Sequence, residues 1–257
     1  MNTEINRRRF LQQAGLYLAA TSATCIGCSS AFGYSHSRGC ALSASDAGGV
    51  GRLVTRITPS QINKLFYAYV DWLNIHTELE PSFAFMQEQY GHNAFALRED
   101  VVRGYSENGS VLFGINLINH LEKWPTLDVL VNYAAMLAVM AHEWAHIAQF
   151  AYGIETYAVK PMELMADFIA GGVVANQEAS SDKHNRSLGK YDQANIDMAA
   201  GAMTVITSMG DRAFNSADHH GTPRERLVAY TNGITFHRQN PSSDFEDVLF
   251  EGHRLYI

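Results

Sequence analysis

The residues best suited to chemistry lie in one stretch, Ala141-His142-Glu143-Trp144-Ala145-His146. His142 and His146 are four positions apart, so on a helix they lie on one face, one turn from each other. That spacing lets both imidazoles reach a single Zn²⁺ ion at about 2.0–2.1 Å. Glu143, beside the first histidine, can act as the general base on a metal-bound water. The pattern predicts metal-assisted hydrolysis.

The sequence around this stretch favours the metal site over a chance match. Residues 127–150 carry apolar side chains at helical spacing, with Thr126 as a suitable N-cap and Gly153 as a stop. A glutamate and two histidines inside an apolar helix are costly to bury without partners. A bound metal supplies that partner.

A third protein ligand is needed, with a fourth position left open for water. Glu163 is the best candidate, because it follows Pro161 at the start of a second expected helix, residues 162–177. Asp167 lies one turn later on the same face, where it can hydrogen-bond the second nitrogen of a ligand histidine. The alternative is that both are solvated acids, which the helix dipole favours in a first turn.

These motifs resemble the gluzincin class of zinc metallopeptidases. The segment Asn93-Ala94-Phe95-Ala96 is similar to one in the CAAX prenyl protease family and its soluble periplasmic relatives. The segment from His220 to Arg226 is similar to a His-x-x-x-x-x-Arg segment near the end of those domains, and also to one in bacterial neutral zinc metallopeptidases. The resemblance covers roughly residues 90–235, but the family's transmembrane helices are not evident.

His220, or less favourably His219, is placed to approach the metal. It can stabilise the oxyanion of the tetrahedral intermediate. The resemblance to periplasmic members implies instead that it occupies the fourth zinc position at rest and moves aside for substrate. A third possibility is a histidine that only caps the helix after Thr222. Arg226 is expected to pair with an acid near the site.

The remaining patterns predict an α+β fold that is mainly helical, with a small antiparallel sheet before the active-site helix. A helix start lies at Thr58-Pro59-Ser60-Gln61, and alternating Phe83 and Phe85 indicate a strand. Asn108-Gly109 predicts a hairpin between strands at 101–105 and 111–115. A later helix is expected from a capping box at Thr222 to a stop at Gly233.

In peptidases of this class, an extended substrate pairs with an edge strand above the metal. Two segments are candidates for that edge, and their residues for substrate binding: Asn93, Ala94 and Phe95 in one, Val111 and Phe113 in the other. The alternative is a purely structural hairpin.

The N-terminus predicts export. Paired arginines in Asn6-Arg7-Arg8-Arg9-Phe10 precede a short apolar run, as in a twin-arginine signal. We expect residues 1–30 to be an export signal, 31–57 a flexible tether and 58–257 a metallopeptidase domain. Cys28 resembles the lipidated residue of a bacterial lipoprotein, which would be the protein's only link to a membrane. The expected location is the periplasm or the cell envelope.

The sequence thus predicts a zinc endopeptidase that binds one Zn²⁺ ion and acts on polypeptides. The alternative is a quality-control protein that holds unfolded envelope proteins, with the metal blocked by His220. A closed, structural metal site is the third reading. The net charge of −7 and the lack of a basic patch beyond the N-terminus argue against nucleic acid as a partner.

Overall fold

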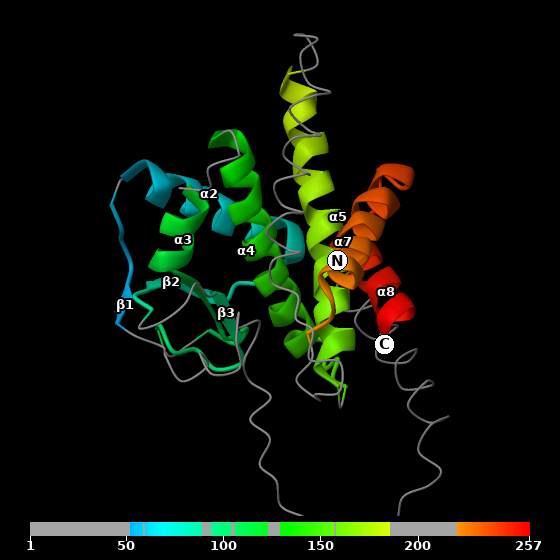
Figure 1. Cartoon of the computed structure of the whole chain (residues 1–257), viewed down its shortest axis with the longest axis horizontal. Coiled ribbons are helices and arrows are strands. Elements are labelled where there is room, and N and C mark those ends of the chain that lie inside the picture. The colour runs from blue at the N-terminus through cyan, green and yellow to red at the C-terminus, as the bar shows by residue number, and fades with distance from the viewer. Residues whose placement is uncertain are drawn as a thin grey trace, which may run out of the picture. The chain divides into compact units, whose positions relative to one another are not determined.

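The chain is described by a computed structural model that covers residues 52–58, 60–88, 94–103, 106–122, 129–156, 158–185 and 220–257. Within these residues the fold is mainly helical with one small sheet, which confirms the predicted α+β class (Figure 1). The elements, in chain order, are β1 (Leu53–Val54), α2 (Ser60–Thr77), β2 (Ser82–Met86), β3 (Ala94–Leu97), β4 (Ser110–Gly114), α3 (Ile115–Glu122), α4 (Val129–Ala151), α5 (Val159–Asn185), α7 (Pro223–Gln239) and α8 (Phe245–Tyr256).

The sheet has the strand order β1-β2-β4-β3 and is mixed. β3 and β4 are antiparallel, as are β1 and β2, but β2 and β4 run parallel. The expectation of a purely antiparallel sheet is therefore wrong in this one pair. β3 lies at the end of the sheet, so β4 lies between β3 and β2 and runs in the same direction as β2.

The predicted hairpin has a different first strand. Residues 101–103 do not form a strand, and the antiparallel partner of β4 is β3 instead. The reason is local: the Asp100 carboxylate accepts hydrogen bonds from the backbone amides of Val102 and Arg103, both at 2.9 Å, and of Ser106 at 2.7 Å. These side-chain contacts compete with strand pairing and fold the segment into a turn.

Helix α2 covers one face of the sheet. The Phe66 ring lies 4.7 Å from that of Phe113 and 5.4 Å from that of Phe85, both edge-on. The opposite face carries a second apolar cluster, formed by Ala84, Met86, Phe95, Leu97 and Leu112. Alternate side chains of the strands thus serve two cores, which explains why every residue of β2, β3 and β4 is buried.

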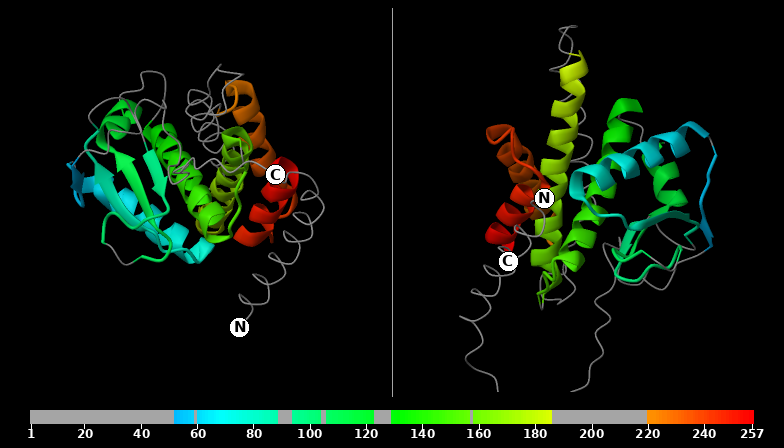
Figure 2. Two further views of the ribbon diagram at one scale, coloured as in Figure 1. Left: turned by 90° about the horizontal axis from the view of Figure 1, so that it is seen from below. Right: turned by 180° about the vertical axis from the view of Figure 1, so that it is seen from behind.

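The longest helices, α4 and α5, pack side by side, and α4 is the one that lies next to the sheet. α4 packs against β3 and against α5, and α5 packs against α7 and α8 on its other side (Figure 2). None of the helices in the described residues is long and apolar enough to cross a membrane.

Glycines let α5 and α7 approach closely. A Cβ atom on Gly233 would lie 1.8 Å from the Phe168 carbonyl oxygen, and one on Gly171 would lie 2.1 Å from that of Tyr230. The prediction that Gly233 ends its helix is wrong, because α7 runs through it to Gln239. Gly233 serves helix packing instead of helix termination.

We predict that Gly233→Ala destabilises the protein by about 1–3 kcal/mol, because the added methyl group forces two backbones apart. The measurement is the free energy of unfolding from urea denaturation. Thr231→Ala, at an exposed position of α7, is the control and should change it by less than about 0.5 kcal/mol. Equal midpoints for the two variants would contradict the close approach.

Candidate metal centre

The two histidines lie in the second half of helix α4, where residues 135–149 are all buried. This helix ends in a Schellman turn: Gly153 adopts a φ of 67°, the Ile154 amide donates to the Gln149 carbonyl at 2.8 Å, and the Gly153 amide donates to the Phe150 carbonyl at 3.2 Å. The predicted stop at Gly153 is therefore present. The turn sends the chain back along α4 as α5, which carries Glu163 toward the histidines.

His142, His146 and Glu163 converge on one point, and their ligand atoms could hold a metal ion. The two Nε2 atoms lie 3.1 Å apart, and each lies 3.3 Å from an oxygen of Glu163. Ligands about 2.0–2.1 Å from a tetrahedral Zn²⁺ are about 3.3 Å from one another. The spacing and the His₂Glu donor set both fit zinc.

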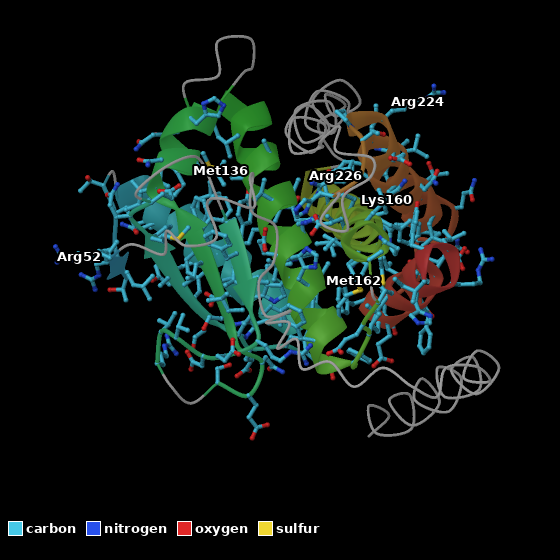
Figure 3. The ribbon with its side chains drawn as sticks, turned by 60° about the horizontal axis from the view of Figure 1, so that its bottom comes forward. Arg52, Met136, Lys160, Met162, Arg224 and Arg226 are labelled. Atoms are coloured by element: carbon cyan, nitrogen blue, oxygen red, sulfur yellow. The ribbon has the colours of Figure 1, made fainter. Side chains whose placement is uncertain are left out.

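Asp167 and Arg226 form a buried ion pair behind this cluster. Arg226 donates from Nε to one Asp167 oxygen at 2.7 Å and from Nη2 to the other at 2.8 Å. Asp167 Oδ1 lies 2.9 Å from Nδ1 of His142, the position that the sequence predicted for it. Arg226, on the side of α7 that is toward α4, also reaches Glu163 at 3.4 Å (Figure 3).

Gln149 contacts the other histidine, and sequence reasoning missed it. Its Oε1 lies 2.7 Å from Nδ1 of His146, and its Nε2 donates to the Met162 carbonyl at 2.9 Å. The available signal was a polar residue in an apolar helix, three positions after His146 and so on the same face.

Glu143 is fully buried, and neither carboxylate oxygen has a hydrogen-bond partner among the described residues. Burial raises the pKa of Glu143 to about 7, against the opposing charges of His142 and His146. A carboxyl group with this pKa can both accept and return a proton near neutral pH.

Glu163 has the opposite character. Burial alone raises its pKa, but the charge of His146 and hydrogen bonds from the surrounding histidines outweigh burial and hold the pKa well below the ordinary value. Glu163 is therefore ionised, as a metal ligand must be.

His220 lies at the mouth of the cluster, with Nδ1 3.5 Å from Glu163 Oε1. Gly221 follows it with a φ of 93°, and Thr222 and Glu225 form the predicted capping box at the start of α7. Lys160 donates to Glu225 at 2.5 Å and lowers the pKa of that carboxyl to about 2. His219 lies outside the described residues.

The strand order separates the two candidate edges for substrate. Among the described residues β3 is an edge strand and packs against α4, so Ala94 and Phe95 lie on an edge as predicted, and their role in substrate binding stays a prediction. β4 is paired on both sides, so the prediction of an edge at Val111 and Phe113 is wrong. Asn93 lies outside the described residues.

A comparison with known sequences decides the classification. The sequence profile of peptidase family M48 matches residues 58–223. The chain belongs to peptidase family M48. No curated protein and no solved structure matches it beyond chance.

M48 peptidases are zinc metallopeptidases, so the gluzincin character and the single-zinc cofactor predicted from sequence are confirmed. The matched region contains the histidine pair, Glu143 and Glu163. It ends at Pro223, so Arg226 lies just beyond it. The narrower resemblances, to the CAAX prenyl protease family's soluble relatives and to neutral zinc metallopeptidases, stay predictions.

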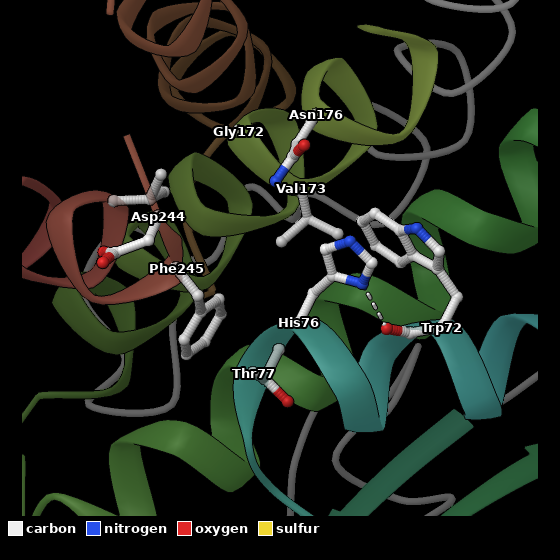
Figure 4. A pocket seen from close by; sticks show the side chains of 9 residues that line it. Trp72, His76, Thr77, Gly172, Val173, Asn176, Asp244 and Phe245 are labelled. Atoms are coloured by element: carbon white, nitrogen blue, oxygen red, sulfur yellow. Dashed lines mark hydrogen bonds between the residues drawn. The ribbon is translucent and has the colours of Figure 1, made fainter. Parts of the chain in front are cut away.

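A small, mainly apolar pocket lies elsewhere, where α2, α5 and α8 meet (Figure 4). It contains none of the predicted site residues. It is lined by Trp72, His76, Thr77, Gly172, Val173, Asn176, Asp244, Phe245 and Val248.

Glu143 gives the zinc-free protein a distinctive pH dependence. Its pKa is raised from 4.5 to about 7 on folding, so between these values the folded state binds more protons than the unfolded state. Stability therefore falls as pH rises through this window. Glu143→Gln removes the effect, so it should stabilise zinc-free protein by up to roughly 3 kcal/mol above pH 7 and by little below pH 5. Urea denaturation at both pH values measures this, and a pH-independent difference would contradict it.

Proposed function

We propose that this M48 peptidase is an endopeptidase in which Glu143 is the general base. The observation that supports this most is the Glu143 carboxylate itself, buried on the helix that carries both histidines and without a hydrogen-bond partner among the described residues. Burying a carboxylate without a partner costs free energy, so such a group is typical of a functional site.

The residues divide the work. His142, His146 and Glu163 would hold one Zn²⁺ ion, which supplies Lewis acidity when bound and so polarises a peptide carbonyl and acidifies water. Glu143 accepts the proton of the attacking water and delivers it to the leaving amine. Asp167, held by Arg226, orients His142.

The edge strand supports cleavage within a chain. An extended polypeptide can add to β3 through main-chain hydrogen bonds, because the far side of β3 has no strand partner among the described residues. Because β3 packs against α4, a polypeptide on β3 would lie beside the helix that carries both histidines. We therefore propose polypeptides, unfolded envelope proteins among them, as substrates.

The second candidate function is a binding protein with little proteolysis, and the position of His220 favours it. With Nδ1 3.5 Å from Glu163, this histidine is close enough to compete for the open metal position. Unfolded chains would then pair with β3 without being cut.

We further propose that the protein is exported and works in the periplasm or at the cell envelope. The paired arginines and the apolar run of the N-terminus support this, and Cys28 would be the lipid attachment site. Radiolabelled palmitate incorporation into wild type, compared with Cys28→Ala, tests the anchor.

Glu143→Gln should lower the hydrolysis of unfolded casein by about 10²–10⁴-fold while zinc content stays at one ion per chain, because only the proton acceptor is lost. Peptide release and metal analysis of the same sample measure both. Glu155→Gln, at an exposed carboxylate that pairs with Arg98, is the matched control and should cleave at the wild-type rate. Undiminished turnover by Glu143→Gln would exclude Glu143 as the base.

His220→Ala separates the two functions. If His220 stabilises the oxyanion, the variant should lose about 10²–10³-fold in kcat. If His220 blocks the metal, casein cleavage should rise and zinc-dependent binding of uncut chains should fall. Unchanged cleavage and binding would assign His220 to helix capping alone.

A further inference from the structure

Gln149 makes two contacts that together determine how His146 faces the metal. We infer that Gln149 is a positioning residue: it holds His146 by Nδ1 so that Nε2 faces the metal, and it ties that ring to the backbone beside Glu163. The inference rests on the proposed ligand set, but it concerns a residue with no role in the proton transfers.

Gln149 lies on α4, three positions after His146, and is completely buried. Oε1 is 2.7 Å from the Nδ1 atom of His146, and Nε2 is 2.9 Å from the carbonyl oxygen of Met162. Met162 directly precedes Glu163 in the first turn of α5 (Figure 3). One amide thus links His146 on α4 to the backbone next to Glu163 on α5.

The orientation of the amide follows from the chemistry of its partners. A backbone carbonyl only accepts hydrogen bonds, so the NH₂ group of Gln149 must face Met162. The reverse orientation would set two oxygens against each other in a buried place. The Gln149 oxygen therefore faces His146, where it can only accept.

This fixes the proton on His146. An acceptor facing Nδ1 requires that Nδ1 carry hydrogen, which leaves the lone pair of the neutral ring on Nε2. Nε2 is the atom that lies 3.1 Å from His142 Nε2 and 3.3 Å from Glu163. Gln149 therefore leaves Nε2 as the nitrogen of His146 that can bind the metal.

The two histidines are held by different chemistry. His142 faces the carboxylate of Asp167, whose charge Arg226 balances, whereas His146 faces a neutral amide. The backbone of Gln149 is fixed as well, because its carbonyl accepts from Ile154 in the Schellman turn. Both ends of the bridge are therefore anchored to the α4–α5 connection.

A residue that only satisfies polar groups in the core would affect stability alone. A positioning residue must also affect the tautomer of His146 and the affinity for zinc, independently of peptide hydrolysis. Nitrogen-15 spectra of the imidazole rings and chelator competition for zinc measure these two properties.

The first experiment uses wild-type protein and needs no variant. Zinc-free protein at about pH 8 should show His146 with hydrogen on Nδ1, because that atom faces the Gln149 oxygen. His146 without hydrogen on Nδ1, or a fast mixture of forms with and without it, would overturn the inference.

The second experiment compares Gln149→Met with wild type. The methionine keeps length and volume but can make neither hydrogen bond, so zinc affinity should fall by about 10- to 100-fold, the usual cost of losing such a partner. His146 should then populate both tautomers. Tyr152→Phe, which removes one hydrogen bond to Glu246 at the same helix end, is the control and should bind zinc like wild type.

The outcomes separate this inference from the proposed function. Zinc binding by Gln149→Met at wild-type affinity overturns the positioning role and leaves the peptidase assignment standing. Failure of wild type to bind zinc removes the proposed function itself. If Gln149→Met does not fold, the wild-type spectra still decide the matter.

Discussion

The constraint on which this structure depends is the burial of charge. At the metal centre three buried carboxylates, Glu143, Glu163 and Asp167, lie with one buried guanidinium, Arg226. Fully ionised, these four groups carry a net charge of −2, which a divalent cation would bring to zero. Without such a cation the raised pKa of Glu143 eases the imbalance, because a protonated Glu143 leaves −1. The net charge of the site therefore matches that of a divalent cation.

That charge balance requires three helices to meet at close range. Arg226 comes from α7 and reaches Asp167 on α5, and this distance is short because Gly171 and Gly233 let the two backbones touch. Two glycines outside the metal centre therefore determine whether the Arg226 guanidinium can contact Asp167. The helix packing and the electrostatics of the site are two aspects of one arrangement.

Sequence reasoning succeeded where the determining interactions are local. The histidine pair, the stop at Gly153 and the capping box at Thr222 depend on spacings within one or two helical turns, which helical periodicity makes visible. The convergence of Glu163 on that pair followed because a short connection must return the chain antiparallel to α4. The mainly helical class was predictable for the same reason.

It failed where distant segments decide. Strand order cannot be obtained from one strand's residues, so β4 was taken for an edge although β2 and β3 flank it. Gly233 has the residue type of a helix end, and only its contact with Phe168 reveals its use. Gln149 was missed because its partner is a backbone carbonyl, which every residue has.

The Schellman turn after α4 also determines how close the metal ligands lie along the chain. It brings His142, His146 and Glu163 into one helical hairpin, residues 142–163, whose ends meet at low cost in chain entropy. Arg226 joins this hairpin from 63 positions further along the chain.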